Sequence, residues 1–271
     1  MPELPEVETT RQGIIPHVNN KKVSKVILRR QKLRWPITPS LTRELPGQTF
    51  TSIDRRGKYL LLATDAGTLL IHLGMSGSLR IVDEQRPVGK HDHVDIVLQD
   101  RLILRYTDPR RFGCMLWQRE DFSSHPLLKS LGPEPLGEEF SADYLFARSR
   151  GRMTSIKTFI MDGKIVVGVG NIYASEALFM SSINPKRAAG KISLARYQLL
   201  TESVKRVLQQ AIEVGGTTLR DFTGSDGEPG YFKQSLAVYG RKGLPCLGCA
   251  QPLKEIRLGQ RSTVYCPACQ R

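Results

Sequence analysis

Long apolar runs are missing from this chain of 271 residues, and its first residues do not have the pattern of a leader segment. No stretch approaches the roughly 20 apolar residues that a membrane-spanning helix needs, and the start lacks the basic-then-apolar order of a secretory signal. We therefore expect a cytoplasmic protein with no membrane partner. With 40% hydrophobic and 24% charged residues, the composition is that of an ordinary globular protein long enough for two domains.

Acidic side chains are scarce relative to basic ones. The chain has 26 Asp and Glu residues against 40 Lys and Arg residues, so its formal charge is +14. Residues 1–148 carry 22 basic and 18 acidic side chains, net +4, whereas residues 149–271 carry 18 and 8, net +10. This balance is typical of proteins that bind nucleic acid, with most phosphate contacts expected in the C-terminal half. A basic protein kept soluble by its charge is the alternative.

The N-terminus reads Met-Pro-Glu-Leu-Pro-Glu-Val-Glu. Removal of Met1 leaves Pro2 as a free secondary amine, with Glu3 and Glu6 beside it. Such an amine has a reference pKa of about 8, which the positive end of a following helix lowers, so it is a nucleophile near neutral pH. Its adduct with an opened sugar is an iminium ion, which promotes elimination. The alternative is that these residues only shape the start of a helix.

Apolar spacing predicts a short amphipathic helix at about Glu6–Ile15, limited by Pro16. Alternating and β-branched runs follow, and they favour an antiparallel sandwich or barrel over a βαβ fold. The predicted strands are Val23–Leu28, Thr51–Ile53, Tyr59–Ala63, Leu69–Leu73, Ser78–Val82, Val94–Leu98, Leu102–Tyr106 and Cys114–Gln118.

The pattern changes at Gly132–Gly137, where glycine and proline predict a linker. Helical periods follow, the last with Ser193 as N-cap and Gly215-Gly216 as C-cap. The predicted helices are Thr154–Met161, Ile172–Met180 and Leu194–Val214. We divide the chain into an N-terminal domain (1–131), a linker (132–147), a helical domain (148–237) and a C-terminal module (238–271).

Two glycine-containing segments lie in the helical domain. Gly163–Asn171 is a tight apolar turn that can present backbone N–H groups and Asn171 to a phosphate, although plain helix packing also explains it. Thr217–Phe232 has charges and no period, and we expect a mobile loop that folds over a ligand.

The four C-terminal cysteines form two Cys-x2-Cys pairs separated by 16 residues, Cys246 with Cys249 and Cys266 with Cys269. This spacing is typical of a zinc ribbon with one tetrahedral Zn²⁺, and two disulfides are the alternative. Between the pairs, Lys254–Leu258 and Ser262–Tyr265 alternate like a hairpin with Gly259–Arg261 at its tip. The fifth cysteine, Cys114, lies in an apolar strand and is expected in the core.

Six blocks together resemble formamidopyrimidine-DNA glycosylase, the bacterial base-excision enzyme for oxidised purines, along the full length of the chain. They are the N-terminal Pro-Glu-Leu-Pro-Glu-Val-Glu, Arg56–Tyr59, His72–Gly77, Asp108–Gly113, Val167–Ala174, and the four cysteines. The resemblance implies an α+β protein with an N-terminal β-sandwich, a helix-two-turns-helix domain and a zinc finger. One departure is Gly163, which follows Asp162 where the family usually has an amide side chain.

The resemblance also implies a role for each matching residue. Pro2 is the expected nucleophile at the sugar C1′, Glu3 the acid at the ring oxygen, and Glu6 a neighbour that orients the site. Lys58 is expected to meet phosphate and assist catalysis, although a solvated lysine at a strand edge is the alternative. The expected phosphate contacts are Lys58, Asn171 and Arg261, with Arg261 also counted as catalytic.

Three further residues match the set that fills the gap left by an extruded nucleotide. Met75 and Phe112 replace the lost stacking and Arg110 pairs with the orphaned cytosine. The alternatives are core positions for Met75 and Phe112, and a salt bridge from Asp108 to Arg110 or Arg111. His91 and Arg152 are the remaining predicted DNA contacts. For His91-Asp92-His93 we favour a polar entry to a strand over a metal site, because no further ligand lies nearby in the sequence.

We therefore predict a monomeric, zinc-containing DNA glycosylase and abasic-site lyase for base excision repair. It acts on 8-oxoguanine and formamidopyrimidines in damaged double-stranded DNA, through a Pro2 Schiff base and β,δ-elimination, and needs no nucleotide cofactor. The alternatives are an endonuclease VIII-like enzyme for oxidised pyrimidines and a catalytically silent zinc-finger protein that binds damaged DNA.

Overall fold

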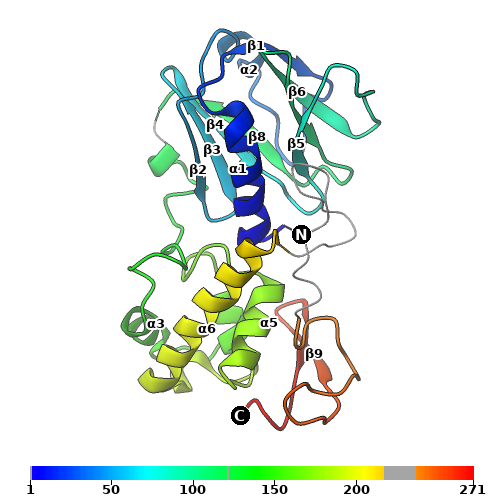
Figure 1. Cartoon of the computed structure of the whole chain (residues 1–271). Helices are drawn as coiled ribbons and strands as arrows, with labels where there is room; N and C mark the ends of the chain where they lie inside the picture. The colour runs from blue at the N-terminus through cyan, green and yellow to red at the C-terminus, as the bar shows by residue number, and fades with distance from the viewer. Residues whose placement is uncertain (1, 121, 217–235) are drawn as a thin grey trace. The chain divides into compact units, whose positions relative to one another are not determined.

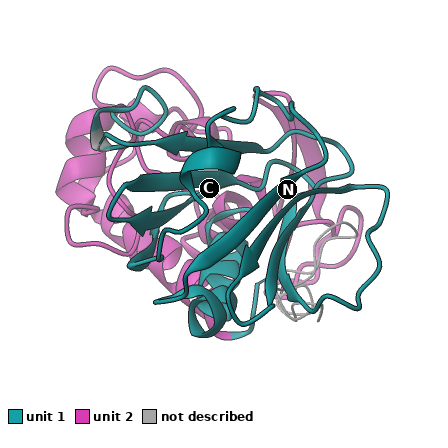
Figure 2. Ribbon diagram, turned by 90° about the horizontal axis from the view of Figure 1, so that it is seen from above, with its two compact units in different colours: residues 1–129, 214–233 teal, residues 130–213, 234–271 magenta. Residues whose placement is uncertain are grey.

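The protein is described by a computed structural model that covers residues 2–120, 122–216 and 236–271 (Figure 1). The loop predicted at Thr217–Phe232 lies outside these described residues. The chain divides into two compact units, residues 1–129 with 214–233 and residues 130–213 with 234–271 (Figure 2). No helix in the described ranges is both long and apolar enough to cross a membrane.

The first unit is built from two antiparallel four-stranded sheets, as predicted. Side chains in β3 alternate between half-buried and buried, the period of a strand with one face on a core. One sheet has the order β1-β6-β7-β5, formed by Val23–Leu28, Asp92–Leu98, Ile103–Thr107 and Ser78–Val82. The other has the order β2-β3-β4-β8, formed by Ser52–Arg56, Tyr59–Thr64, Gly67–His72 and Cys114–Gln118.

Apolar side chains from both sheets and from helix α1 (Leu4–Val18) form one hydrophobic core. Helix α1 packs against β2, β3 and β5, so it touches both sheets (Figure 1). Cys114 is buried as predicted, and burial raises the pKa of its thiol to about 11, so this cysteine is protonated and inert at neutral pH. The short helices α2 (Leu41–Glu44) and η1 (Phe122–Ser124) complete the unit.

Helix α1 is longer than predicted, because it starts at Leu4 and continues through Pro16 to Val18. The expectation that Pro16 limits the helix is wrong. Proline in the last turn removes one backbone donor, and the turn still closes through the amide of Asn19, which donates to the Ile15 carbonyl at 3.0 Å. The helix therefore runs for 15 residues from its N-cap at Glu3.

The second unit is helical and carries a C-terminal hairpin. The three predicted helices are present, and α6 packs against α5 and α3. Helix α3 was not predicted, although Ser141 gives a local signal because its Oγ accepts the Tyr144 amide at 3.2 Å. The helices are α3 (Ala142–Ser149), α4 (Ile156–Ile160), α5 (Asn171–Met180), η2 (Ala189–Lys191) and α6 (Leu194–Glu213).

The C-terminal hairpin pairs β9 (Lys254–Leu258) with β10 (Arg261–Tyr265). Gly259 and Gln260 have φ values of +52° and +63°, the left-handed conformations of a two-residue hairpin turn. Arg261 was predicted at the tip. It is instead the first residue of β10, paired with Leu258, so the sheet holds its backbone.

Candidate functional site

The N-terminal residues form the mouth of helix α1. Pro2 is buried, and so are Glu3 and Glu6, which are 2% and 0% exposed. Glu3 and Glu6 form a capping box, in which the Glu3 amide donates to Glu6 Oε2 at 2.7 Å. The positive end of the helix and two carboxylates therefore surround the residue predicted as the nucleophile.

The segment that follows α6 also reaches this mouth. Gly216 has a φ of +82°, and a Cβ built on it lies 3.3 Å from the Glu6 carboxylate. A side chain at this position is disfavoured both by the left-handed backbone and by Glu6. The two glycines predicted as the C-cap of α6 therefore have a second role, because one of them lets the backbone approach Glu6 closely.

Lys58 lies in the turn between β2 and β3, next to Gly57, and is half-buried. Arg55 connects this turn to α1, because its Nη1 donates to the Gly57 carbonyl at 2.9 Å while its Nε donates to Glu8 Oε2 at 2.9 Å. Lys58 is thus attached through its turn to the helix that carries Glu3.

His72, at the end of β4, lies within electrostatic reach of Lys58. Burial, together with the positive charges of Lys58 and Arg34, lowers the pKa of His72 to about 4. The imidazole is therefore neutral at pH 7, and its Nδ1 accepts the amide of Gly74 at 3.0 Å. This hydrogen bond ties the Met75 turn to the strand that pairs with Tyr59.

Met75, Arg110 and Phe112 lie on two neighbouring turns of the first unit. Phe112 is 44% exposed, Met75 is half-buried, and the Arg110 guanidinium lies 5.0 Å from the centre of the Phe112 ring. Phe112 is therefore not a core residue. The alternative of an ion pair from Asp108 is also wrong, because within the described chain the buried Asp108 carboxylate accepts hydroxyl and amide hydrogens and pairs with neither neighbouring arginine.

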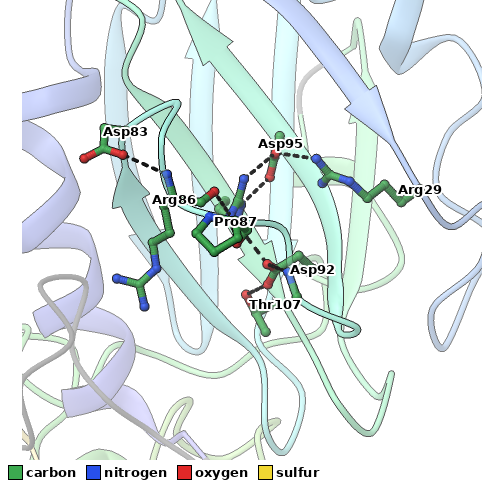
Figure 3. A network of polar contacts seen from close by, with 9 residues as sticks. Arg29, Asp83, Arg86, Pro87, Asp92, Asp95 and Thr107 are labelled. Carbon is green, nitrogen blue, oxygen red and sulfur yellow. Dashed lines mark hydrogen bonds and ion pairs between the residues drawn. The ribbon is translucent and has the colours of Figure 1, made fainter.

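His91 ends the loop between β5 and β6. This loop is fixed by buried charge, because Arg105 donates to Asp95 at 2.8 and 2.9 Å and to the carbonyls of Arg86 and Pro87 (Figure 3). Burial raises the pKa of Asp95, but Arg105 and Arg29 outweigh it and the pKa is lowered, so the network stays ionised. Among the described residues, the cluster suited to a metal consists of the four cysteines, and His91 is not part of it.

Asn171 is the first residue of α5 in the second unit. Its Oδ1 accepts a hydrogen bond from Lys157 Nζ at 2.7 Å. An ammonium group only donates, so the Asn171 amide is oriented with its oxygen toward Lys157 and its NH₂ group directed elsewhere. Two donors at a helix N-terminus suit a phosphate.

Lys157 also joins helix α4 to the hairpin. It is 1% exposed, and it donates to Thr263 Oγ1 at 2.8 Å and to the Ser262 carbonyl at 3.3 Å. Lys157 was not singled out from the sequence, because a lysine is normally a surface residue and nothing in its spacing predicts burial.

Arg152 and Arg261 line one cavity of about 420 Å³ in the second unit, together with Thr158 of α4. Both arginines are exposed. The structure therefore places two arginines that lie far apart in the sequence on the same cavity, which Asp162 also lines. Asn171 is connected to the same hairpin through Lys157.

The four C-terminal cysteines have the geometry of a metal site. Their sulfur atoms lie within 4.8 Å of one another, with 3.9 Å between Cys246 and Cys269 and 3.5 Å between Cys249 and Cys266. Tetrahedral Zn–S bonds of about 2.3 Å place sulfurs about 3.8 Å apart, whereas a disulfide needs about 2.05 Å. The cluster fits one zinc ion, and the disulfide alternative is wrong.

Sequence profiles of known families cover most of the chain. Residues 1–115 match the formamidopyrimidine-DNA glycosylase N-terminal domain, residues 131–223 match the H2TH domain of the same family, and residues 243–271 match the zinc finger found in FPG and IleRS. With the sandwich, the helical unit and the cysteine cluster, these matches define a zinc-finger DNA glycosylase of base excision repair.

Whole-chain relatives agree with these domain matches. The chain is 60% identical to a formamidopyrimidine-DNA glycosylase of Stutzerimonas stutzeri and 56% identical to one of Marinobacter nauticus, over 100% of each chain. The chain belongs to the formamidopyrimidine-DNA glycosylase family.

Solved structures show the same fold. A MutM (Fpg) protein from Thermus thermophilus has a TM-score of 0.88 at 38% identity, with 99% of this chain and 98% of that chain covered. A Lactococcus lactis FPG mutant in complex with a Fapy-dG containing DNA has a TM-score of 0.91 at 33% identity, with 100% of both chains covered. The predicted family, fold class and zinc finger are confirmed.

Proposed function

We propose that the protein excises oxidised purines from duplex DNA and then cleaves the abasic strand, with Pro2 as the nucleophile. The observation that carries this proposal is the buried capping box of Glu3 and Glu6 beside Pro2 at the positive end of α1. The amine of Pro2 therefore lies beside carboxyl groups that can exchange protons with a reacting sugar.

The chemistry starts once Met1 has been removed. The lone pair of the Pro2 nitrogen forms a bond to C1′ while the bond from C1′ to the base breaks. The departing base takes up the proton that the Pro2 nitrogen loses. Glu3 donates a proton to the sugar ring oxygen, the ring opens, and a C1′ iminium results. Loss of a proton from C2′ expels the 3′ phosphate, and a second elimination expels the 5′ phosphate. Water finally hydrolyses the iminium and frees Pro2.

Phosphate contacts come from both units in this proposal. Lys58 of the first unit is joined to α1 through Arg55, whereas Asn171, Arg152 and Arg261 belong to the second. Support comes from the net charge of +10 on residues 149–271 and from the shared cavity of Arg152 and Arg261. Similar proteins have been solved in complex with DNA that contains Fapy-dG or an abasic site.

Exposed side chains of the first unit take the place of the extruded nucleotide. Met75 and Phe112 replace its stacking, and Arg110 offers a planar fork to the base left without a partner. His91, on the loop held by Arg105, is a further contact to the DNA backbone. We place this activity in the bacterial cytoplasm, where the chromosomal substrate lies.

Borohydride trapping tests the proposal. The protein without Met1 is incubated with duplex DNA containing 8-oxoguanine opposite cytosine, and hydride reduces the iminium to a stable amine that joins the protein to the DNA. We expect an adduct at Pro2 by peptide mapping, which Pro2→Gly and retention of Met1 abolish. Tight DNA binding without any adduct would instead identify a catalytically silent binding protein.

A panel of lesions tests the substrate class. We expect 8-oxoguanine and formamidopyrimidine duplexes to be cleaved faster than duplexes with oxidised pyrimidines. This comparison is needed because Lactococcus lactis Fpg has also been solved with an oxidized pyrimidine containing DNA. Faster cleavage of the pyrimidine lesions would favour the endonuclease VIII-like alternative.

A further inference from the structure

Asp108 connects three segments of the first unit although its own side chain reaches no surface. The residue is 0% exposed. Its Oδ1 accepts Ser76 Oγ at 2.8 Å and the Arg110 amide at 3.2 Å. Its Oδ2 accepts the Gly113 amide at 2.9 Å and Tyr106 Oη at 3.2 Å. All four donors therefore converge on one carboxylate, and two of them come from the turn that carries Arg110 and Phe112.

The backbone of Asp108 reaches the third segment. Its amide donates to the His91 carbonyl at 3.0 Å, and its own carbonyl lies 2.8 Å from His93 Nε2. The loop that ends at His91 is therefore attached to the same residue. Three turns that carry proposed DNA contacts share this single buried point.

Ser76 directly connects the turn that carries Met75 to the turn that carries Arg110 and Phe112. Its hydroxyl donates to Asp108 and accepts the Arg110 amide at 3.2 Å, so it lies between the backbone next to Met75 and the backbone of Arg110. Gly74 adds backbone contact, because a Cβ built on it lies 2.4 Å from the Phe112 carbonyl carbon and from the Gly113 nitrogen. With this packing, one turn cannot shift without moving the other.

We propose that Asp108 is a positioning residue that holds Met75, Arg110 and Phe112 as one rigid wedge, and so sets how Arg110 reads the base opposite the lesion. This inference rests on the proposed function of those three residues. Their side chains are exposed or half-buried, and the hydrogen bonds from the Arg110 and Gly113 amides to Asp108 hold the backbone that carries two of them. A carboxylate suits this task, because two oxygens with four lone-pair sites satisfy four donors at once.

Asparagine at position 108 keeps the shape of the aspartate side chain but removes its charge and one of its two acceptor oxygens. It offers one oxygen and one NH₂ group, and the NH₂ group faces donors on its side of the site. About half of the connections are therefore lost while the volume is kept. Ser76→Ala is a milder change that removes only the hydroxyl between the two turns. Ser78→Ala is the matched control, because Ser78 is equally buried and its side chain makes no hydrogen bond within the described residues.

The experiment measures single-turnover excision of 8-oxoguanine opposite cytosine and opposite adenine. A well-placed arginine fork is a main source of discrimination between bases, so we expect Asp108→Asn and Ser76→Ala to reduce the preference for cytosine about tenfold. Ser78→Ala should keep it. Cleavage of a preformed abasic site, which needs no opposing-base readout, should change far less. A general loss of folded protein would lower all these rates together and leave the ratio unchanged.

Spectroscopy and Arg110→Ala separate this inference from the proposed function. Pyrrolocytosine, a fluorescent cytosine analogue, is placed opposite an abasic analogue in the DNA. Its fluorescence change on binding Ser76→Ala should differ from its change on binding the unchanged protein. Arg110→Ala should lose the preference for cytosine. The double variant with Ser76→Ala should have the same preference as Arg110→Ala alone. If Arg110→Ala keeps the preference, the wedge function itself fails. If Arg110→Ala loses it while folded Ser76→Ala and Asp108→Asn keep it, the positioning role of Asp108 is overturned and the function stands.

Discussion

Replacing Glu8 with glutamine tests how the catalytic helix is attached to the sheet. Glu8 Oε1 accepts from Arg11 at 2.7 Å and its Oε2 accepts from Arg55 at 2.9 Å, with the Glu8 side chain only 11% exposed. Burial alone would raise the pKa of Glu8, but hydrogen bonds and charges from Arg11 and Arg55 outweigh it and lower the pKa from 4.5 to about 2.

The size of the effect follows from this pKa. One pKa unit corresponds to about 1.4 kcal/mol, so ionised Glu8 stabilises the fold by about 3 kcal/mol at neutral pH. Because the folded-state pKa lies below the unfolded value, this stabilisation is present at pH values above 4.5 and is lost as the pH falls to about 2. Glu8→Gln should therefore lower the free energy of unfolding by about 3 kcal/mol at pH 7 and by progressively less below pH 4.5.

Urea unfolding followed by tryptophan fluorescence measures this difference, because Trp35 and Trp117 both lie in the first unit. Asp100→Asn is the control, since its ion pair with Lys21 joins side chains that are 34% and 42% exposed and is worth less than about 1 kcal/mol. A loss in Glu8→Gln that is equal at pH 7 and pH 3 would refute the reasoning, because it would mean that packing and not ionisation stabilises the contact.

Three further predictions concern the rest of the site. Lys157→Met should weaken DNA binding about tenfold, because it releases the Asn171 side chain and a hydrogen bond from a charged group contributes about 1.5–3 kcal/mol. Fluorescence anisotropy measures the DNA affinity. An unchanged affinity, or a full additional loss of affinity on adding Asn171→Ala, would show that Lys157 does not act through Asn171. Removal of zinc by a chelator, or Cys266→Ser, should abolish DNA binding while leaving the tryptophan fluorescence of the first unit unchanged. An unaffected DNA affinity would contradict a structural role for the metal. Gly216→Ala should slow formation of the borohydride-trapped adduct, because alanine disfavours a φ of +82° and its Cβ lies 3.3 Å from Glu6; a normal trapping rate would show that this close approach does not matter.

Much of the fold could be predicted from local patterns in the sequence. All eight strands of the first unit were predicted at or near their observed positions, because alternation of apolar residues is a local signal that survives in the sheet. Helix α5 and the hairpin of β9 and β10 were likewise predictable from their flanking turns. The zinc site was the clearest case, since the spacing of Cys246, Cys249, Cys266 and Cys269 already implies one tetrahedral ion.

Boundaries and connections were less predictable. Pro16 continues a helix that its residue type was expected to end, and α3 was missed although it begins inside the predicted linker, residues 132–147. In both cases the outcome depends on which backbone donors and acceptors find partners. That balance is settled by individual hydrogen bonds and packing, not by residue propensity.

Residue types and spacing were enough to predict Pro2 and its neighbouring carboxylates as candidates for the proposed chemistry, and to predict the four cysteines as zinc ligands. The buried residues that support these groups became visible only in the folded protein. Asp108, Glu8 and Lys157 are buried polar groups with partners far away in the chain. Asp108 contacts Ser76, 32 positions away, Glu8 contacts Arg55, 47 positions away, and Lys157 contacts Thr263, 106 positions away. A buried charge is stable only where several distant donors or acceptors converge on it, and this convergence is a property of the folded chain.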